Sequence, residues 1–234
     1  MGPRPHFSGR AILATLRGSL IVSCQASPGD PLDHLDTLTR IAASALHGGA
    51  GGLRAEGVAS IAAFRALSKL PIIGMIKTRD GEGDIYITPD FRSAQAVSEA
   101  GADIVALDCT HRRLAESEPW PALMERIHAE LDRPVLADIA TLEDALAAET
   151  AGADAVATTL YGYTAETSGL RTVSWPLVES LVALLKIPVI VEGHISRPEE
   201  MRKAFELGAH CVVIGAAITR PDIITARFVR AIGI

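Results

Sequence analysis

Eight short apolar runs rich in valine and isoleucine are spaced along nearly the whole chain, and longer segments with helical periodicity separate them. The runs cover residues 20–23, 52–54, 72–77, 104–108, 135–138, 155–159, 189–192 and 211–214. This alternation is typical of repeated βα units that build a parallel sheet, and eight is the number of strands that closes a (β/α)8 barrel. We therefore predict an α/β fold, a single-domain (β/α)8 TIM barrel with eight parallel strands.

Helices are expected between the runs, at residues 31–47, 60–68, 90–100, 120–131, 142–151, 175–185 and 198–207. Several begin at good capping residues, such as Asp90 and Thr141. A Gly-Ala pair stands between helix and strand three times, at 101–102, 152–153 and 208–209. Glycine at this place ends a helix in a left-handed turn and returns the chain to the sheet.

No linker or low-complexity segment divides the 234 residues. We expect residues 1–15 to be an N-terminal tail, disordered or an entry helix, and residues 16–234 to be the barrel. The alternative fold, an open doubly wound sheet, would carry a glycine-rich nucleotide loop after the first strand. The segment from Ser23 to Gly29 lacks that fingerprint.

The composition of the chain restricts the classes of binding partner that we expect. With 28 acidic and 22 basic residues the net charge is −6, and no basic run is present, so we expect neither nucleic acid nor an anionic membrane as a partner. No apolar run approaches the roughly 20 residues of a membrane span. The three cysteines fall in or next to apolar runs and indicate small interior residues in a reducing compartment, which favours a cytoplasmic protein.

Polar residues close most of the runs, and in a barrel such strand ends surround one mouth. They are Gln25, Arg54, Lys77, Asp108, Asp138, Thr159 and Glu192. Gly193 follows the seventh run, and Gly215 and Ala216 follow the eighth, where this architecture commonly binds phosphate through backbone N–H groups. Arg220 stands just beyond and adds charge. The ligand class expected is a phosphorylated small molecule.

Nine short strings closely resemble the N-acetylmannosamine-6-phosphate 2-epimerase family, whose barrel is of the ribulose-phosphate-binding type. They are VSCQA at 22–26, GLRAEG at 52–57, IGMIK at 73–77, YITP at 86–89, ALD at 106–108, ADI at 137–139, TTLYGYT at 158–164, VEGHI at 191–195 and GAAITRP at 215–221. The match runs from about residue 16 onward. Two residues depart from the expected pattern, Tyr161 and His194.

The resemblance implies interconversion of N-acetylmannosamine 6-phosphate and N-acetylglucosamine 6-phosphate in sialic-acid catabolism, with neither metal nor other cofactor. It also implies that Lys77 and Glu192 are the catalytic pair. The positions of Gln25, Arg54, Asp138 and Arg220 match the family's substrate-binding residues, to which we add Thr159 from its strand-end position.

Inverting C2 of a 2-acetamido aldose requires ring opening, removal of the proton beside the aldehyde, and its return on the opposite face. Such a site needs a base, an acid and an oxyanion stabiliser. We assign Lys77 to C2 proton transfer, with a pKa lowered by burial or by Arg54, and Glu192 to ring opening or the second proton. Plainer interpretations remain open: Lys77 reaching solvent, Glu192 as its structural partner, and Asp138 as a helix cap.

Two other functions stay open as well. A strand-end lysine in a phosphate-binding barrel could form a Schiff base in an aldolase, and a barrel without turnover could serve as a phosphosugar sensor. Asp108 and His111 are three positions apart, which favours hydrogen-bonded scaffold over a metal site. The polar segment 78–86 is either a lid or a solvated loop, and apolar helix faces favour a homodimer.

Overall fold

The computed structural model describes residues 10–80, 85–112 and 117–233. Eight parallel strands close into a barrel in the order β1-β10-β9-β8-β7-β6-β3-β2, which confirms the predicted (β/α)8 fold and excludes the open doubly wound sheet. The barrel strands are β1 (Leu20–Cys24), β2 (Gly52–Glu56), β3 (Ile72–Met75), β6 (Ile104–Asp108), β7 (Val135–Asp138), β8 (Ala155–Ala157), β9 (Val189–Glu192) and β10 (Cys211–Ile214).

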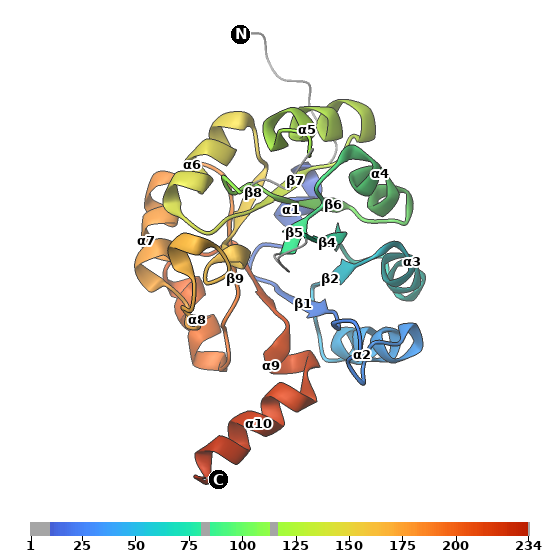
Figure 1. Cartoon of the computed structure of the whole chain (residues 1–234), viewed down its shortest axis with the longest axis vertical. Coiled ribbons are helices and arrows are strands. Elements are labelled where there is room, and N and C mark those ends of the chain that lie inside the picture. The colour runs from blue at the N-terminus through green and yellow to red at the C-terminus, as the bar shows by residue number, and fades with distance from the viewer. Residues whose placement is uncertain (1–9, 81–84, 113–116, 234) are drawn as a thin grey trace.

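Helices form a ring around this barrel (Figure 1). They are α2 (Leu35–His47), α3 (Val58–Leu67), α4 (Phe91–Glu99), α5 (Trp120–Arg126), α6 (Leu142–Ala151), α7 (Trp175–Leu184) and α8 (Pro198–Glu206). All seven expected helices are therefore present. Asp90 caps α4 by accepting from the Ser93 amide at 2.7 Å, and Thr141 and Asp144 form a capping box at the start of α6.

Two helices differ most from the prediction, and α3 also begins two residues earlier than expected, at Val58. The helix expected from residue 31 begins at Leu35, because Asp30 first makes a turn in which its Oδ1 accepts from the Leu32 amide at 2.8 Å. The helix expected at 120–131 is α5 followed by one π-helical turn, η1 (Ile127–Leu131). The three Gly-Ala glycines were predicted correctly: Gly101, Gly152 and Gly208 have φ angles of 109°, 108° and 99°.

The barrel interior is filled by β-branched and leucine side chains, and the amino-terminal end is closed by α1 (Arg10–Thr15). Leu13 and Leu16 of this segment are buried against the strand residues, and His210 Nε2 lies 2.7 Å from the Leu13 carbonyl oxygen. Part of the predicted tail is thus an entry helix, while residues 1–9 lie outside the described residues. All three cysteines are buried and free.

The third predicted strand is shorter than expected. It ends at Met75, and Lys77 instead begins β4 (Lys77–Arg79), which pairs antiparallel with β5 (Ile85–Ile87). The hairpin forms because the Thr88 amide donates to the Ile76 carbonyl at 2.7 Å and returns the chain to the barrel rim. Residues 81–84, part of the segment expected to be a lid or a solvated loop, lie outside the described residues.

The sixth predicted strand also ends early. β8 stops at Ala157, and residues Thr158–Leu160 form a 3₁₀ turn, η2. The Thr158 hydroxyl accounts for this change, since Oγ1 donates to the Glu192 carbonyl at 2.8 Å and accepts from the Glu192 amide at 3.0 Å. A second 3₁₀ turn, η3 (Ala165–Thr167), follows in the same loop.

Two C-terminal helices were not predicted, α9 (Ala216–Thr219) and α10 (Pro221–Ala231). α10 extends away from the helix ring (Figure 1) and has no buried residue. Phe228 and Ile232 are 71% and 70% exposed. No helix in the described part of the chain is long and apolar enough to cross a membrane.

Candidate active site

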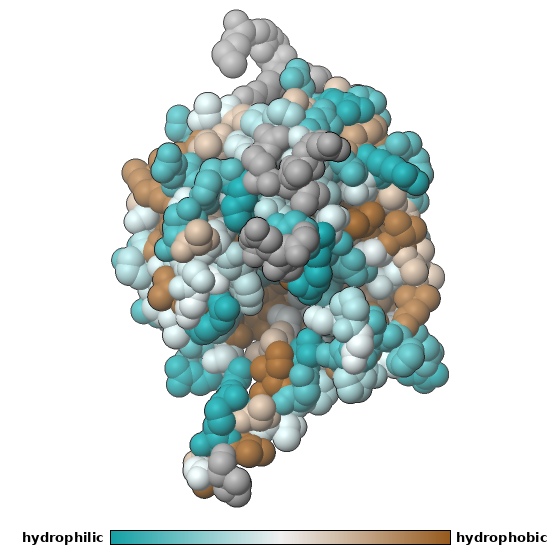
Figure 2. All heavy atoms as spheres, in the orientation of Figure 1, coloured by the Kyte–Doolittle hydropathy of each residue, from teal (hydrophilic) through white to brown (hydrophobic). Residues whose placement is uncertain are grey.

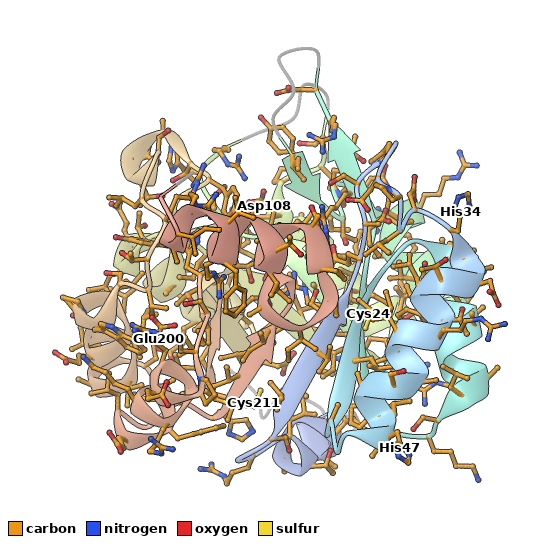
Figure 3. All side chains as sticks on the ribbon, turned by 90° about the horizontal axis from the view of Figure 1, so that it is seen from below. Cys24, His34, His47, Asp108, Glu200 and Cys211 are labelled. Atoms are coloured by element: carbon orange, nitrogen blue, oxygen red, sulfur yellow. The ribbon has the colours of Figure 1, made fainter. Side chains whose placement is uncertain are left out.

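A cavity of about 810 Å³ lies at the carboxyl ends of the strands. Figure 2 shows this face, hollowed between its middle and α9. In Figure 3 the β4–β5 hairpin projects beyond the same end of the barrel, near Asp108, whereas Cys211 and His47 lie toward the opposite end. Eight of the ten site residues predicted from the sequence line the cavity, namely Gln25, Lys77, Thr159, Glu192, Gly193, Gly215, Ala216 and Arg220.

The remaining two, Arg54 and Asp138, lie inside the barrel wall and are completely buried. They form a bidentate pair, in which Arg54 Nη1 donates to Asp138 Oδ1 at 3.0 Å and Nη2 donates to Oδ2 at 2.6 Å. Asp138 caps no helix, because α6 starts at Thr141. Both side chains therefore lie below the cavity, where they can contact the residues that line it.

Glu192 is the lining residue that Arg54 holds. Arg54 Nη1 donates to Glu192 Oε2 at 2.5 Å, and Thr159 completes the cluster by donating from Oγ1 to Asp138 Oδ1 at 2.5 Å. A guanidinium fork with two carboxylates leaves each side chain little freedom. The Glu192 side chain is 11% exposed, so it reaches the cavity while its other contacts are in the protein.

Burial and charge shift the pKa values of this cluster. Burial raises the pKa of Glu192, the charge of Arg54 lowers it and that of Asp138 raises it again, with a result of about 7. Burial acts to lower the pKa of Arg54, but the charges of Asp138 and Glu192 outweigh it and raise that pKa. Arg54 thus stays a cation, whereas Glu192 can gain and lose a proton near neutrality.

Lys77 reaches the same cavity from the hairpin. Its side chain keeps contact with solvent, yet the surrounding protein lowers its pKa by desolvation, and the charge of Arg54 lowers it further. Glu56, Glu192 and Asp138 act in the opposite direction. The net lowering brings the amine closer to the neutral form that a base or nucleophile requires.

Gln25 offers the cavity a hydrogen-bond acceptor. Its Nε2 donates to Ser23 Oγ at 2.6 Å, and its Oε1 is buried without a hydrogen-bond partner in the described structure. An unpartnered buried oxygen costs free energy unless a ligand or water donates to it. Ser23, which the strand-end pattern did not single out, therefore orients the Gln25 side chain.

Positive charge dominates the cavity. Beside Lys77 and Arg220, three arginines that the sequence analysis missed also line it, namely Arg112, Arg171 and Arg227. Among the residues that the structure describes, Glu192 is the only carboxylate in this lining. The three arginines come from loops and from α10 rather than from strand ends, so a pattern based on strand ends did not find them. A cationic cavity in a protein of net charge −6 selects anionic ligands by local charge.

The turns after β9 and β10 lie beside this charge. Gly193 has a φ of 98° and Gly215 precedes the first turn of α9. Arg220 is 20% exposed and pairs with Asp30 at 2.5 Å and with Asp222 at 2.8 Å. Gly193, Gly215 and Ala216 of these turns line the cavity together with Arg220, at the place where this architecture commonly binds phosphate.

The two residues that depart from the family pattern touch each other at the rim. His194 has a φ of 61°, and its Nε2 lies 3.0 Å from the Tyr161 carbonyl oxygen. Its ring stacks on that of Tyr163 at 5.7 Å between centroids. Only the backbone of Tyr161 makes this contact, so the unusual side chain at 161 does not determine it.

Groups that bind metals do not gather in the described ranges, where no three of the His, Cys, Asp and Glu residues form a suitable cluster. Asp108 accepts from the Thr110 hydroxyl at 2.7 Å and pairs with Arg112 at 2.9 Å, while His111 Nε2 lies 3.0 Å from Glu166. The predicted scaffold role of Asp108 and His111 is consistent with these contacts.

A closed (β/α)8 barrel with Lys77 and Glu192 in one cationic cavity at its carboxyl-terminal mouth has the architecture of a barrel enzyme for small anionic substrates. Residues 38–234 match the family described as "Putative N-acetylmannosamine-6-phosphate epimerase". The chain belongs to this family.

Individual relatives cover almost the whole chain. A protein of Cutibacterium acnes named "Putative N-acetylmannosamine-6-phosphate 2-epimerase" is 44% identical over 219 residues, 93% of this chain and 95% of that one. A solved structure of the N-acetylmannosamine-6-phosphate 2-epimerase from Clostridium perfringens has a TM-score of 0.90 and 41% identity, with 99% of each chain covered. A thiamine phosphate pyrophosphorylase from Pyrococcus furiosus, 18% identical with a TM-score of 0.61 over 92% of this chain and 93% of that one, shares the fold alone.

Proposed function

We propose that the protein interconverts N-acetylmannosamine 6-phosphate and N-acetylglucosamine 6-phosphate by moving a proton at C2, a step of sialic-acid catabolism. The observation that carries the proposal is that Lys77 and Glu192, from distant parts of the chain, line one cationic cavity with their pKa values shifted toward each other. A carboxyl group with a pKa of about 7 beside an amine with a lowered pKa is the kind of pair that a two-face epimerisation requires.

In the proposed reaction the open-chain aldose loses the C2 proton to one group, and the electron pair moves into a C1–C2 double bond with negative charge on O1. The other group returns a proton to the opposite face of C2, and the aldehyde reforms. We assign C2 proton transfer to Lys77, and ring opening or the second proton to Glu192. Arg54 holds Glu192 in place, and its charge with that of Lys77 favours the negative intermediate.

The rest of the cavity orients the substrate in this proposal. Gln25 Oε1 and the Thr159 hydroxyl bind sugar hydroxyl or amide groups, whereas Arg54 and Asp138 act through Glu192 and Thr159. The 6-phosphate binds at the turns that contain Gly193, Gly215 and Ala216, with charge from Arg220.

No metal or organic cofactor takes part in the proposed mechanism. The Arg54 guanidinium occupies the position between the Asp138 and Glu192 carboxylates, so the fixed positive charge that a metal would supply comes from a side chain. Turnover should therefore survive dialysis against a metal chelator. The substrate and the net charge of −6 also fit a cytoplasmic enzyme that binds neither nucleic acid nor membrane.

The deciding experiment is incubation of the purified protein with N-acetylmannosamine 6-phosphate in D2O, followed by NMR of the anomeric and C2 proton signals. Appearance of N-acetylglucosamine 6-phosphate with deuterium at C2 is the expected result. If neither product nor exchange appears, the proposal is wrong for this substrate. Binding without exchange would instead favour the noncatalytic phosphosugar-binding barrel.

The lowered pKa of Lys77 also favours a second candidate, a Schiff-base aldolase, since a neutral amine can attack a carbonyl. Borohydride added with a phosphorylated keto acid would trap the adduct. A covalent adduct on Lys77 would support the aldolase, and an unmodified protein that still exchanges the C2 proton would exclude it.

A bell-shaped pH profile is expected for kcat/KM. The active enzyme needs one proton shared between the two groups, so activity rises as pH increases through the Glu192 pKa of about 7 and falls at a value below the ordinary lysine pKa of 10.5. At pH values below the acidic limb, Lys77 and Glu192 are both protonated and no base is present. At pH values above the basic limb, both have lost their protons and no acid is present. A Glu192→Gln variant should lose the acidic limb in its residual activity. A wild-type profile that is flat between about pH 6 and 8 would contradict the assignment.

A homodimer remains our prediction for the assembly. Its support is α10, an amphipathic helix that buries none of its side chains and exposes Phe228, Val229 and Ile232, apolar groups that a second copy would cover. Light scattering should give about twice the chain mass of 24.7 kDa. The variant F228D/I232D should shift the mass to that of a monomer, whereas a monomeric wild-type protein at micromolar concentration would exclude the dimer.

A further inference from the structure

Arg112 connects three separate segments at the cavity rim. Its Nη2 donates to the carbonyl of Ile85 in β5 at 3.3 Å and to Asp108 Oδ2 at the end of β6 at 2.9 Å. Its Nη1 donates to the carbonyl of Tyr163 in the loop after β8 at 3.3 Å, and its Nε donates to Thr110 Oγ1 at 3.3 Å. All three guanidinium nitrogens are thus in use.

The segment that contains Ile85 is the hairpin that begins with Lys77. In this hairpin Lys77 pairs with Ile87, and Ile85 pairs with Arg79 at the other end of the ladder. The hydrogen bonds between Ile76 and Thr88 close the root of the hairpin, directly after β3 ends at Met75. The Arg112 bond to Ile85 fixes the opposite end of the described ladder, so the hairpin is held at two points.

An aromatic contact strengthens the second attachment. The Arg112 guanidinium carbon lies 5.1 Å from the ring centroid of Tyr86, the middle residue of β5, within the range of a cation–π interaction. Tyr86 is itself buried at 8% exposure. The guanidinium therefore contacts two consecutive residues of the strand that pairs with β4.

Asp108 provides the fixed end of this connection. The Asp108 and Arg112 side chains are 8% and 10% exposed, and Asp108 Oδ1 is held by the amide and hydroxyl of Thr110 at 3.1 and 2.7 Å. A planar guanidinium can make these divergent bonds together, whereas a lysine ammonium donates from a single nitrogen. The geometry, more than the charge, is what arginine contributes here.

We propose that Arg112 is a positioning residue for Lys77: through Ile85 and Tyr86 it holds the β4–β5 hairpin so that the Lys77 amine stays over the reacting carbon. This role rests on the proposed function, since it assigns proton transfer to Lys77. Displacement of a catalytic group by about 1 Å can cost on the order of 100-fold in rate. The Tyr163 bond ties the same guanidinium to the loop that carries Thr159.

The test compares Arg112→Lys with Arg112→Met in two measurements. In steady-state kinetics, positioning predicts that both variants lose kcat by about 30- to 100-fold while KM changes by less than about 3-fold. If Arg112 mainly binds the anionic substrate, Arg112→Lys keeps kcat and Arg112→Met mainly raises KM, and the proposal is overturned.

Amide hydrogen exchange on the intact protein gives a readout that needs no substrate. Both variants should exchange faster in the described strands β4 and β5, with the barrel strands still protected. Arg171→Lys is the matched control, because Arg171 lines the same cavity but bonds the carbonyls of Gly162 and Leu170, and it should leave the hairpin protected.

Unchanged hairpin exchange in both Arg112 variants would refute the positioning role whatever the activity. An inactive wild-type protein whose hairpin loosens in the variants would refute the proposed function instead. The two failures are therefore distinguishable.

Discussion

Replacing Lys77 with alanine lowers kcat for C2 epimerisation by about 10²- to 10⁴-fold, the contribution typical of a positioned acid–base group. The reason is that Lys77 lies in the same cavity as Glu192 and has a pKa lowered by desolvation and by Arg54. Turnover is measured by NMR in both directions, and deuterium incorporation at C2 falls with it. Lys77→Arg should be nearly as inactive, because arginine keeps the charge but does not release a proton.

Lys69→Ala is the matched control. Lys69 is an exposed lysine near the amino end of β3, away from the cavity, and its removal should leave kcat and melting temperature unchanged. Lys77→Ala should also keep the wild-type melting temperature, since the side chain retains contact with solvent. Near wild-type turnover in Lys77→Ala would show that the lysine only reaches solvent at the rim.

Replacing Arg54 with methionine should reduce the free energy of unfolding by about 3–5 kcal/mol, the cost of breaking a buried ion pair from one side. The change leaves Asp138, which is completely buried, without its cation, and removes the donor at 2.5 Å from Glu192. Urea unfolding followed by circular dichroism measures the loss. Activity should disappear as well, because nothing then fixes the Glu192 carboxylate.

Two further variants test the cause of that loss of stability. The double variant R54M/D138L removes both members of the bidentate pair and should regain part of the stability, because no unpaired carboxylate then remains at position 138, while Glu192 still lacks its donor. Arg40→Met breaks an exposed pair with Asp36, whose side chains are 79% and 77% exposed, and should leave unfolding unchanged within error. If R54M is as stable as wild type, the cluster is not the buried network that its contacts indicate.

Most of the fold could be predicted from the sequence. Strand and helix positions follow from local periodicity, and the start of α6 follows from the side chain of Thr141, which needs only its neighbours to cap a helix. The misplaced end of the sixth predicted strand has a long-range cause. β8 stops at Ala157 because Thr158 bonds the backbone of Glu192, 34 positions away, and no local pattern encodes that contact.

The same distinction between local patterns and long-range contacts holds for the candidate site. Strand-end position placed Lys77, Glu192, Gln25 and Thr159 at one mouth, because parallel strands in a barrel share their carboxyl edge. It could not find Arg112, whose contacts are to carbonyl groups in β5 and in the loop after β8. α10 was missed because none of its residues is fully buried, so its periodicity did not point toward a core.

The sequence by itself determined the number and order of the barrel elements and the chemical groups at the mouth, since these depend on side-chain type and spacing along the chain. The tertiary structure alone decided how those groups are used. Arg54 is 84 positions from Asp138 and 138 from Glu192, and only barrel closure brings the three side chains together and removes them from water. Burial and neighbouring charge set the pKa of Glu192, and both are properties of the folded barrel.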